Sequence, residues 1–172
     1  MVLLNNLNER RLEAKELLYE FRKMYSNLKT RIKKYEIKLA GLHEEEDKML
    51  IMYVTECVQL ALNKFILVNK SMTLCDTILK NYDNEFKILQ QLSTGPQYLL
   101  NDRVSRCSRH LYSFNDPLRR GENEIRIANK HLKKINDHIV FLRSMNRVPK
   151  RWKGEGMVFP FTIDRDRLSV RG

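Results

Sequence analysis

The sequence predicts an all-α protein: an elongated helical bundle or coiled coil with long heptad-patterned helices and a non-helical C-terminal tail. Apolar residues recur at alternating spacings of three and four along three stretches, as on a helix that lies along other helices. Gly and Pro number only six and four among 172 residues, too few for an all-β chain. The hydrophobic fraction of 42% is sufficient for a core.

The first apolar seam runs through eleven positions: Leu4, Leu7, Ala14, Leu18, Phe21, Tyr25, Leu28, Ile32, Tyr35, Leu39 and Leu42. Arg11 occupies the one missing position. A charge that faces a neighbouring helix destabilises the contact unless it is paired, so we expect an acidic residue opposite Arg11 on a partner. The outer face of this helix is expected to carry the basic cluster Arg31, Lys33, Lys34 and Lys38.

The second seam follows the stretch up to residue 92, at Val54, Val58, Ala61, Phe65, Val68, Met72, Cys75, Leu79, Tyr82, Phe86 and Leu89. It is out of phase with the first, because no whole number of heptads joins Leu39 to Ile51. We therefore interpret residues 1–92 as long coiled-coil helices, with a hairpin at 41–44 favoured over one unbroken helix. The sequence Ser-Thr-Gly-Pro at 93–96 ends the stretch.

The rest of the chain is expected to contain three further parts. Residues 93–121 are predicted to be a connector with a short basic helix, in which 115–117 (Asn-Asp-Pro) forms a turn or starts a new helix. Residues 122–146 are predicted to be a third heptad helix, with its seam at Ile125, Ala128, Leu132, Ile135, Ile139 and Leu142. Residues 147–172 are predicted to be a basic, Trp-containing extended tail.

The net charge of +11 is concentrated at one end of the chain. Residues 1–50 hold eleven Lys and Arg against nine Asp and Glu, and residues 51–100 hold four against four. Residues 101–172 hold seventeen against eight, which is a surplus of nine. A one-sided surplus favours an acidic surface that meets this end of the protein.

The sequence carries no catalytic, cofactor or metal signature. It contains no nucleophile elbow and no glycine-rich phosphate loop. His131 and His138 lie seven residues apart, too far to hold one metal ion without a third ligand. The three cysteines are widely separated, which is typical of small core residues in a reducing compartment. We expect a protein that is not an enzyme and has no cofactor.

The apolar run at 50–68 raises the question of a membrane span. Glu56 and Lys64 lie near its middle, with Gln59 and Asn63 between them. A charge at that depth costs about 2.5–3.5 kcal/mol on insertion scales, so we expect no span. A helix buried on most sides by other helices explains the run better. The expected location is intracellular, in the cytoplasm or cytoskeleton rather than the nucleus.

Three sets of candidate binding residues follow from these patterns. The expected interface with partner helices comprises Leu18, Phe21, Tyr25, Leu28, Ile32, Tyr35, Leu39, Leu132, Ile135 and Ile139. The residues expected to meet an acidic surface are Arg103, Arg106, Arg109, Arg119, Arg120, Arg126, Lys130, Lys133 and Lys134. An apolar tail segment must fold back on the bundle or dock in a partner's groove, through Trp152, Phe159, Phe161 and Ile163.

These features favour a non-enzymatic scaffold subunit of a multi-protein helical assembly, of the microtubule-associated cytoskeletal type. Its partners would be other helical proteins, in a hetero-oligomer rather than a homo-oligomer, and an acidic polymer such as a microtubule. The alternative is a nucleic-acid-associated subunit, of chromatin or of a ribonucleoprotein such as a ribosome. It would use the basic stripe over residues 103–153 to neutralise phosphates.

Overall fold

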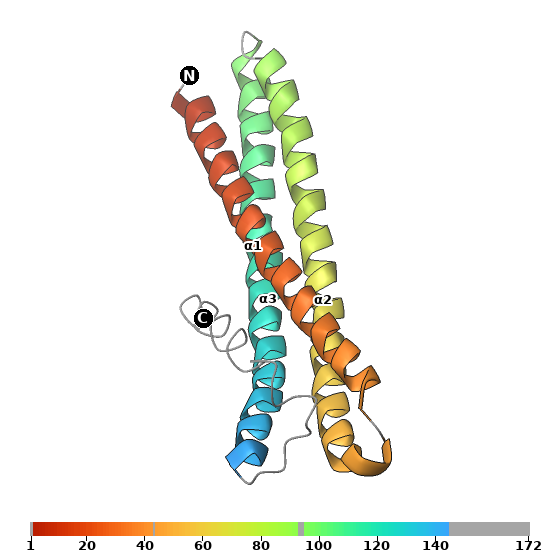
Figure 1. The fold of residues 1–172 in the computed structure, drawn as a ribbon. Coiled ribbons are helices and arrows are strands. Elements are labelled where there is room, and N and C mark those ends of the chain that lie inside the picture. The colour runs from red at the N-terminus through yellow and green to blue at the C-terminus, as the bar shows by residue number, and fades with distance from the viewer. Residues whose placement is uncertain (1, 43, 93–94, 145–172) are drawn as a thin grey trace. The chain divides into compact units, whose positions relative to one another are not determined.

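The structure is a computed structural model that describes residues 2–42, 44–92 and 95–144. These residues form three α helices and no strand: α1 (Val2–Ala40), α2 (Glu44–Gln91) and α3 (Gln97–Ser144) (Figure 1). The predicted all-α class is confirmed. Contacts divide the chain into two units, and each helix contributes a segment to both. Unit 1 comprises Met1–Met24 with Val68–Glu122, and unit 2 comprises Tyr25–Leu67 with Asn123–Gly172.

Unit 1 buries apolar side chains from all three helices. The main contributors are Leu7, Leu18 and Phe21 from α1, Val68, Leu79, Tyr82, Phe86 and Leu89 from α2, and Leu111, Phe114 and Leu118 from α3. The hydroxyl of Tyr82 donates a 2.7 Å hydrogen bond to the Leu7 carbonyl, so this buried phenol is satisfied by α1. The bond ties α1 to α2 within the core.

A glycine on α3 sets how closely α1 approaches in unit 1. Gly121 is buried, and a Cβ at this position would overlap the ring of Phe21, which is fully buried, and lie 3.1 Å from Cβ of Ser71. Glycine in a helix interior costs about 1 kcal/mol relative to alanine. The space it leaves for the phenylalanine ring compensates for that cost.

Unit 2 has an analogous core. Its buried apolar side chains come from Leu28, Ile32 and Tyr35 of α1, Leu50, Val54, Val58 and Ala61 of α2, and Ile125, Ala128, Leu132, Ile135 and Ile139 of α3. The rings of Tyr25 and Phe65 stack with centroids 4.8 Å apart. Lys64 and Glu124, both half-buried, form an ion pair of 3.2 Å between α2 and α3.

Short turns join the helices. α1 ends at Ala40, and the N–H groups of Gly41 and Leu42 donate to the carbonyls of Lys38 and Leu39 at 3.1 Å. The break before α2 falls within 41–44, where the out-of-phase seams favour a hairpin. After α2, the Gly95 N–H donates to the Leu92 carbonyl at 2.8 Å, next to the proline that precedes α3.

The predicted connector over 93–121 was wrong, because α3 is one helix from Gln97 to Ser144 with Pro117 in its interior. Proline removes one backbone hydrogen bond and usually kinks or ends a helix. Here an apolar seam continues across the proline, with buried side chains at Cys107, Leu111, Phe114, Leu118 and Ile125. Burial of that seam outweighs the local cost of the proline, so the third helix also begins well before the predicted residue 122.

The predicted tail at 147–172 lies outside the described residues. The same holds for its candidate docking residues Trp152, Phe159, Phe161 and Ile163. Their proposed role stays a prediction.

Substitution of Gly121 by alanine should destabilise the protein. The new methyl group gains about 1 kcal/mol of helix propensity, but overpacking against Phe21 costs about 1–3 kcal/mol. We expect a net loss, measured as a lower urea midpoint at unchanged slope. Phe21→Leu in the same chain should recover part of the loss, because the two changes are coupled. Additive effects of the two substitutions would contradict the close contact.

Candidate interaction surfaces

The residues predicted to contact partner helices lie in the cores of the two units. In unit 1 these are Leu18 and Phe21, both buried. In unit 2, Leu28, Ile32, Tyr35, Leu132, Ile135 and Ile139 are buried, whereas Tyr25 and Leu39 are half-buried. Helices of the same chain cover these side chains. The seams therefore form the protein's own core, and their buried side chains are not open to a partner.

The acidic residue expected opposite Arg11 is supplied by the chain itself, not by a partner. The Arg11 guanidinium donates a 2.5 Å hydrogen bond to the carboxylate of Asp83 on α2. Lys15 lies 3.6 Å from the same carboxylate, and Arg11 also packs over the ring of Phe86 at 5.6 Å. The polar position in the first seam is thus an internal contact between α1 and α2 of unit 1.

Arg31 does not belong to an exposed basic cluster, as the sequence suggested. Its exposed fraction is only 3%, and its guanidinium donates to the side-chain oxygen of Asn129 on α3. Asn129 in turn donates a 3.0 Å hydrogen bond to the Ile125 carbonyl. The signal was present in the sequence: Arg31 lies three residues after Leu28 and four before Tyr35, on the flank of the seam.

Some of the basic residues of unit 1 form ion pairs with carboxylates of the same unit. Arg103 and Arg106 both reach the carboxylate of Glu85 on α2, at 2.8 and 4.0 Å. Arg106 and Arg120 also pair with carboxylates one turn away on α3, those of Asp102 and Asp116. The side chains of Arg109 and Arg119 are exposed and form no ion pair within the described residues.

The basic residues of unit 2 are more open. Arg126, Lys130 and Lys134 follow one another at four-residue spacing on the exposed face of α3, and Lys133 is half-buried beside them. Arg126 contacts the side-chain oxygen of Asn123. The three lysines form no ion pair within the described part of the chain. Four basic side chains thus share one helical segment.

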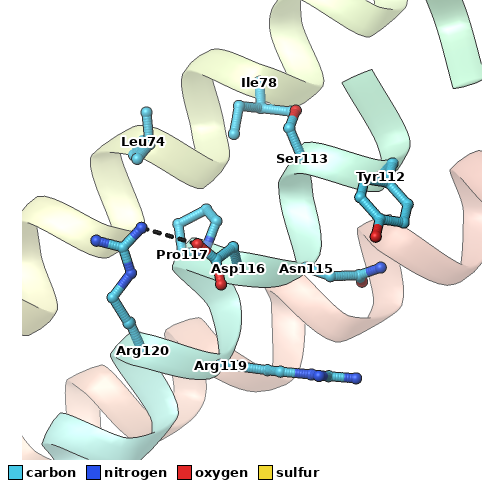
Figure 2. A pocket seen from close by; sticks show the side chains of 9 residues that line it. All are labelled: Leu74, Ile78, Tyr112, Ser113, Asn115, Asp116, Pro117, Arg119 and Arg120. Atoms are coloured by element: carbon cyan, nitrogen blue, oxygen red, sulfur yellow. Dashed lines mark hydrogen bonds and ion pairs between the residues drawn. The ribbon is translucent and has the colours of Figure 1, made fainter. Parts of the chain in front are cut away.

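A groove of about 630 Å³ opens on unit 1 between α2 and α3 (Figure 2). Its apolar lining comes from Leu74 and Ile78 on α2 and from Pro117 on α3. The polar lining comes from the stretch of α3 around the proline: Tyr112, Ser113, Asn115, Asp116, Arg119 and Arg120. Two apolar side chains of this groove are open to solvent, with exposed fractions of 45% for Leu74 and 79% for Tyr112.

The outer face of α2 in unit 2 is the second open apolar surface. Ten residues from Lys48 to Leu67 are exposed, and five of them are large and apolar: Met49, Met52, Leu60, Ile66 and Leu67. Only Lys48 and Glu56 among the ten are charged. The exposed residues of α1 in this unit include four charged ones and a single large apolar residue, Ile37.

This apolar character extends along α2. Within the described residues, the segment Lys48–Gln91 is long and apolar enough to cross a membrane, by length and composition only, and its most apolar 18-residue stretch has a mean hydropathy of 1.4. A core helix of a bundle can meet the same criterion. The expectation that α2 would be buried on most sides is wrong. One face of the helix is exposed, and only 28% of the most apolar stretch is buried.

The three cysteines lie in the packed parts of both units. Cys57, Cys75 and Cys107 are buried free thiols. Burial, reinforced by nearby carboxylates, raises the pKa of Cys75 to about 12 and that of Cys107 to about 11. His138 packs against Tyr53 with ring centroids 4.3 Å apart. The described residues contain no group of three His, Cys, Asp or Glu side chains placed to hold a metal ion.

No family model, curated protein or solved structure matches this chain.

Replacement of Arg31 by methionine should destabilise the protein by roughly 1–3 kcal/mol, because it leaves the buried Asn129 oxygen without its donor. Adding Asn129→Leu should recover much of that loss, since a buried polar pair replaced by apolar side chains is often neutral. Urea unfolding of both variants provides the measurement. A double variant less stable than Arg31→Met alone would contradict the pairing.

The thiols of Cys75 and Cys107 should be nearly inert in the folded protein. Their raised pKa values keep them protonated, and the thiolate is the reactive form, so at about pH 8 we expect labelling by a thiol reagent to be at least about a hundredfold slower than in urea. Mass spectrometry of peptides after timed alkylation separates the sites. Equal labelling rates with and without urea would contradict the burial of these side chains.

Proposed function

We propose that this protein is a non-enzymatic structural subunit of a multi-protein helical assembly, and that a partner helix binds the outer face of α2 in unit 2. The observation that carries the proposal is the set of five large apolar side chains exposed on this face. Exposed apolar surface of this extent marks interaction sites in proteins that otherwise keep charged outer faces.

The spacing of this face supports packing as a coiled coil. Positions 49, 52, 56, 60, 63 and 67 follow one another at intervals of three or four, and four of the six carry exposed apolar side chains: Met49, Met52, Leu60 and Leu67. A helix that presents its own apolar seam would complete these contacts by knobs-into-holes packing. Methionine adapts to irregular partners, which suits the end of the face that carries Met49 and Met52.

The two polar positions of the face favour a different chain as the partner. Asn63 would fix register, as a single buried asparagine does in coiled coils. Glu56 would bring two carboxylates together in a parallel pair of identical helices, which is unfavourable. A partner with Lys or Arg opposite Glu56 relieves this repulsion, so the proposal is a hetero-oligomer.

The open basic residues support a second contact, with an acidic polymer such as a microtubule. In unit 1 the exposed arginines without ion pairs are Arg109 and Arg119, and in unit 2 Lys130, Lys133 and Lys134 are available. Such a contact places the protein in the cytoplasm or the cytoskeleton. Reduced thiols agree with that location. We keep the expectation that α2 does not span a membrane, because Glu56 and Lys64 lie within its apolar segment.

A nucleic-acid-associated role is the alternative, favoured by the four neighbouring basic side chains of unit 2. Phosphate contacts made by these residues would give an affinity that falls steeply with salt. The ion pairs of Arg103 and Arg106 with Glu85 reduce the number of arginines available to this role in unit 1.

Site-specific photocrosslinking in native cells tests the proposal. A photoreactive amino acid at Met52 or at Leu60 should form nuclease-resistant adducts with a helical protein other than this chain. The same group at Ile37, an exposed apolar residue on α1 of unit 2, should form none. Leu60→Glu should abolish co-purification of the same partner with unchanged helix content, whereas Ile37→Glu should not.

Each alternative has its own outcome. Adducts between two copies of this chain would contradict the hetero-oligomer. Adducts from Lys130 and Lys134 that disappear with nuclease, with none from Met52 or Leu60, would move the assignment to nucleic acid. A monomer that forms no adduct from α2 would end the proposal of a structural subunit bound through this face.

A further inference from the structure

The groove of unit 1 is a separate surface from the outer face of α2 in unit 2, and its chemistry differs. It combines an apolar floor with two arginines on the side of α3 (Figure 2). Leu74 and Ile78 contribute from one turn of α2, and the lining of α3 extends from Tyr112 to Arg120. These nine α3 positions correspond to a helix length of about 12 Å, which suits a short segment rather than a long helix.

Apolar side chains of the groove are exposed to solvent, so a ligand can contact them. The Leu74 side chain is almost half exposed, although it neighbours a buried core, and the Tyr112 ring extends into solvent. Figure 2 shows Leu74 and Arg120 on one side of Pro117, and Tyr112, Asn115 and Arg119 on the other. A bulky apolar side chain placed over Pro117 would therefore have polar groups on both flanks.

Pro117 also changes the hydrogen bonding of the groove. Proline has no N–H, so its nitrogen gives no bond to the carbonyl of Ser113, four residues earlier. The Ser113 hydroxyl donates to the His110 carbonyl at 3.0 Å and so remains with its own helix. In an α helix the proline ring itself crowds the Ser113 carbonyl, so the polar contacts that the groove offers come from its side chains.

The charges of the groove select the sign of the ligand. Arg119 forms no ion pair among the described residues. Arg120 forms one, with the carboxylate of Asp116 at 3.1 Å, and both side chains of this pair are exposed to solvent. Arg109, also without an ion pair, lies about one turn before the lining. The lining itself holds one carboxylate and two guanidinium groups, so its net positive charge favours an anionic ligand over a cationic one.

We propose that this groove binds a short acidic segment of a partner protein that inserts one bulky apolar side chain between Leu74, Ile78 and Pro117. Its carboxylates pair with Arg119 and Arg120. Arginine suits this role because its planar donors match carboxylates with two parallel hydrogen bonds. The inference does not depend on the helix partner of unit 2.

The test is fluorescence anisotropy of the full chain with an array of short labelled peptides in which the positions of one Phe and its flanking glutamates vary. A second array has Lys in place of every Glu, and a third has Ala in place of Phe. We expect saturable binding of members of the first array only. Replacement of Phe by Ala should weaken binding about tenfold or more, the amount expected for loss of a buried aromatic side chain.

Variants assign the binding to the groove. Arg119→Glu with Arg120→Glu should weaken binding about tenfold, since both carboxylate contacts become repulsive. Leu74→Ser should weaken it with unchanged circular dichroism. Lys87→Glu reverses one charge at an exposed position of α2 outside the lining and should have no effect.

Two results would overturn the proposal: an acidic array that binds no better than the lysine array, or binding that the groove variants leave unchanged. Met52→Glu, which alters the outer face of α2 in unit 2, should retain peptide binding. Peptide binding and the helix partner can therefore fail independently.

Discussion

The rest of the structure depends on one constraint: each helix carries an apolar seam that must be covered, and a single chain provides the cover. In both units the seam positions of α1, α2 and α3 bury one another. Burial of apolar surface is the main favourable term in folding. The seam residues are therefore already buried in the folded chain and are not exposed to a partner. The exposed apolar residues on the outer face of α2 in unit 2 and in the groove of unit 1 are outside these cores and remain open to a ligand.

Apolar burial alone does not fix how the helices align, because seams of similar spacing can slide past one another. Two contacts supply that specificity. In unit 1, Phe21 fits only where Gly121 leaves room for its ring. In unit 2, Arg31 must reach Asn129, since displacement by one turn would leave a guanidinium buried without this oxygen. Both contacts join α1 to α3, the pair of helices that no short turn connects.

The sequence predicted the helical class, the seams and the region of the first turn, because each depends on periodicity that a single chain displays. It did not predict which surface covers a seam, since the same spacing describes an internal core and a partner interface. Local propensity predicts a turn or helix start at Pro117, but the seam from Cys107 to Ile125 continues through the proline and keeps the helix intact. The basic neighbours of Arg31 predict an exposed face, but its side chain is buried. Tertiary contacts decide these positions, and no local pattern contains them.

The basic residues follow the same logic as the apolar ones: the part that remains after internal pairing is the part available for binding. Arg103 and Arg106 hold Glu85 and thereby tie α2 to α3 in unit 1. An external anion that recruited them would have to replace a contact within the unit, and the exchange would gain little free energy. Arg119 and the lysines of α3 in unit 2 carry no such cost. Tests of the proposed acidic partner should therefore begin with Arg119 and these lysines, although the longer run of arginines is more conspicuous in the sequence.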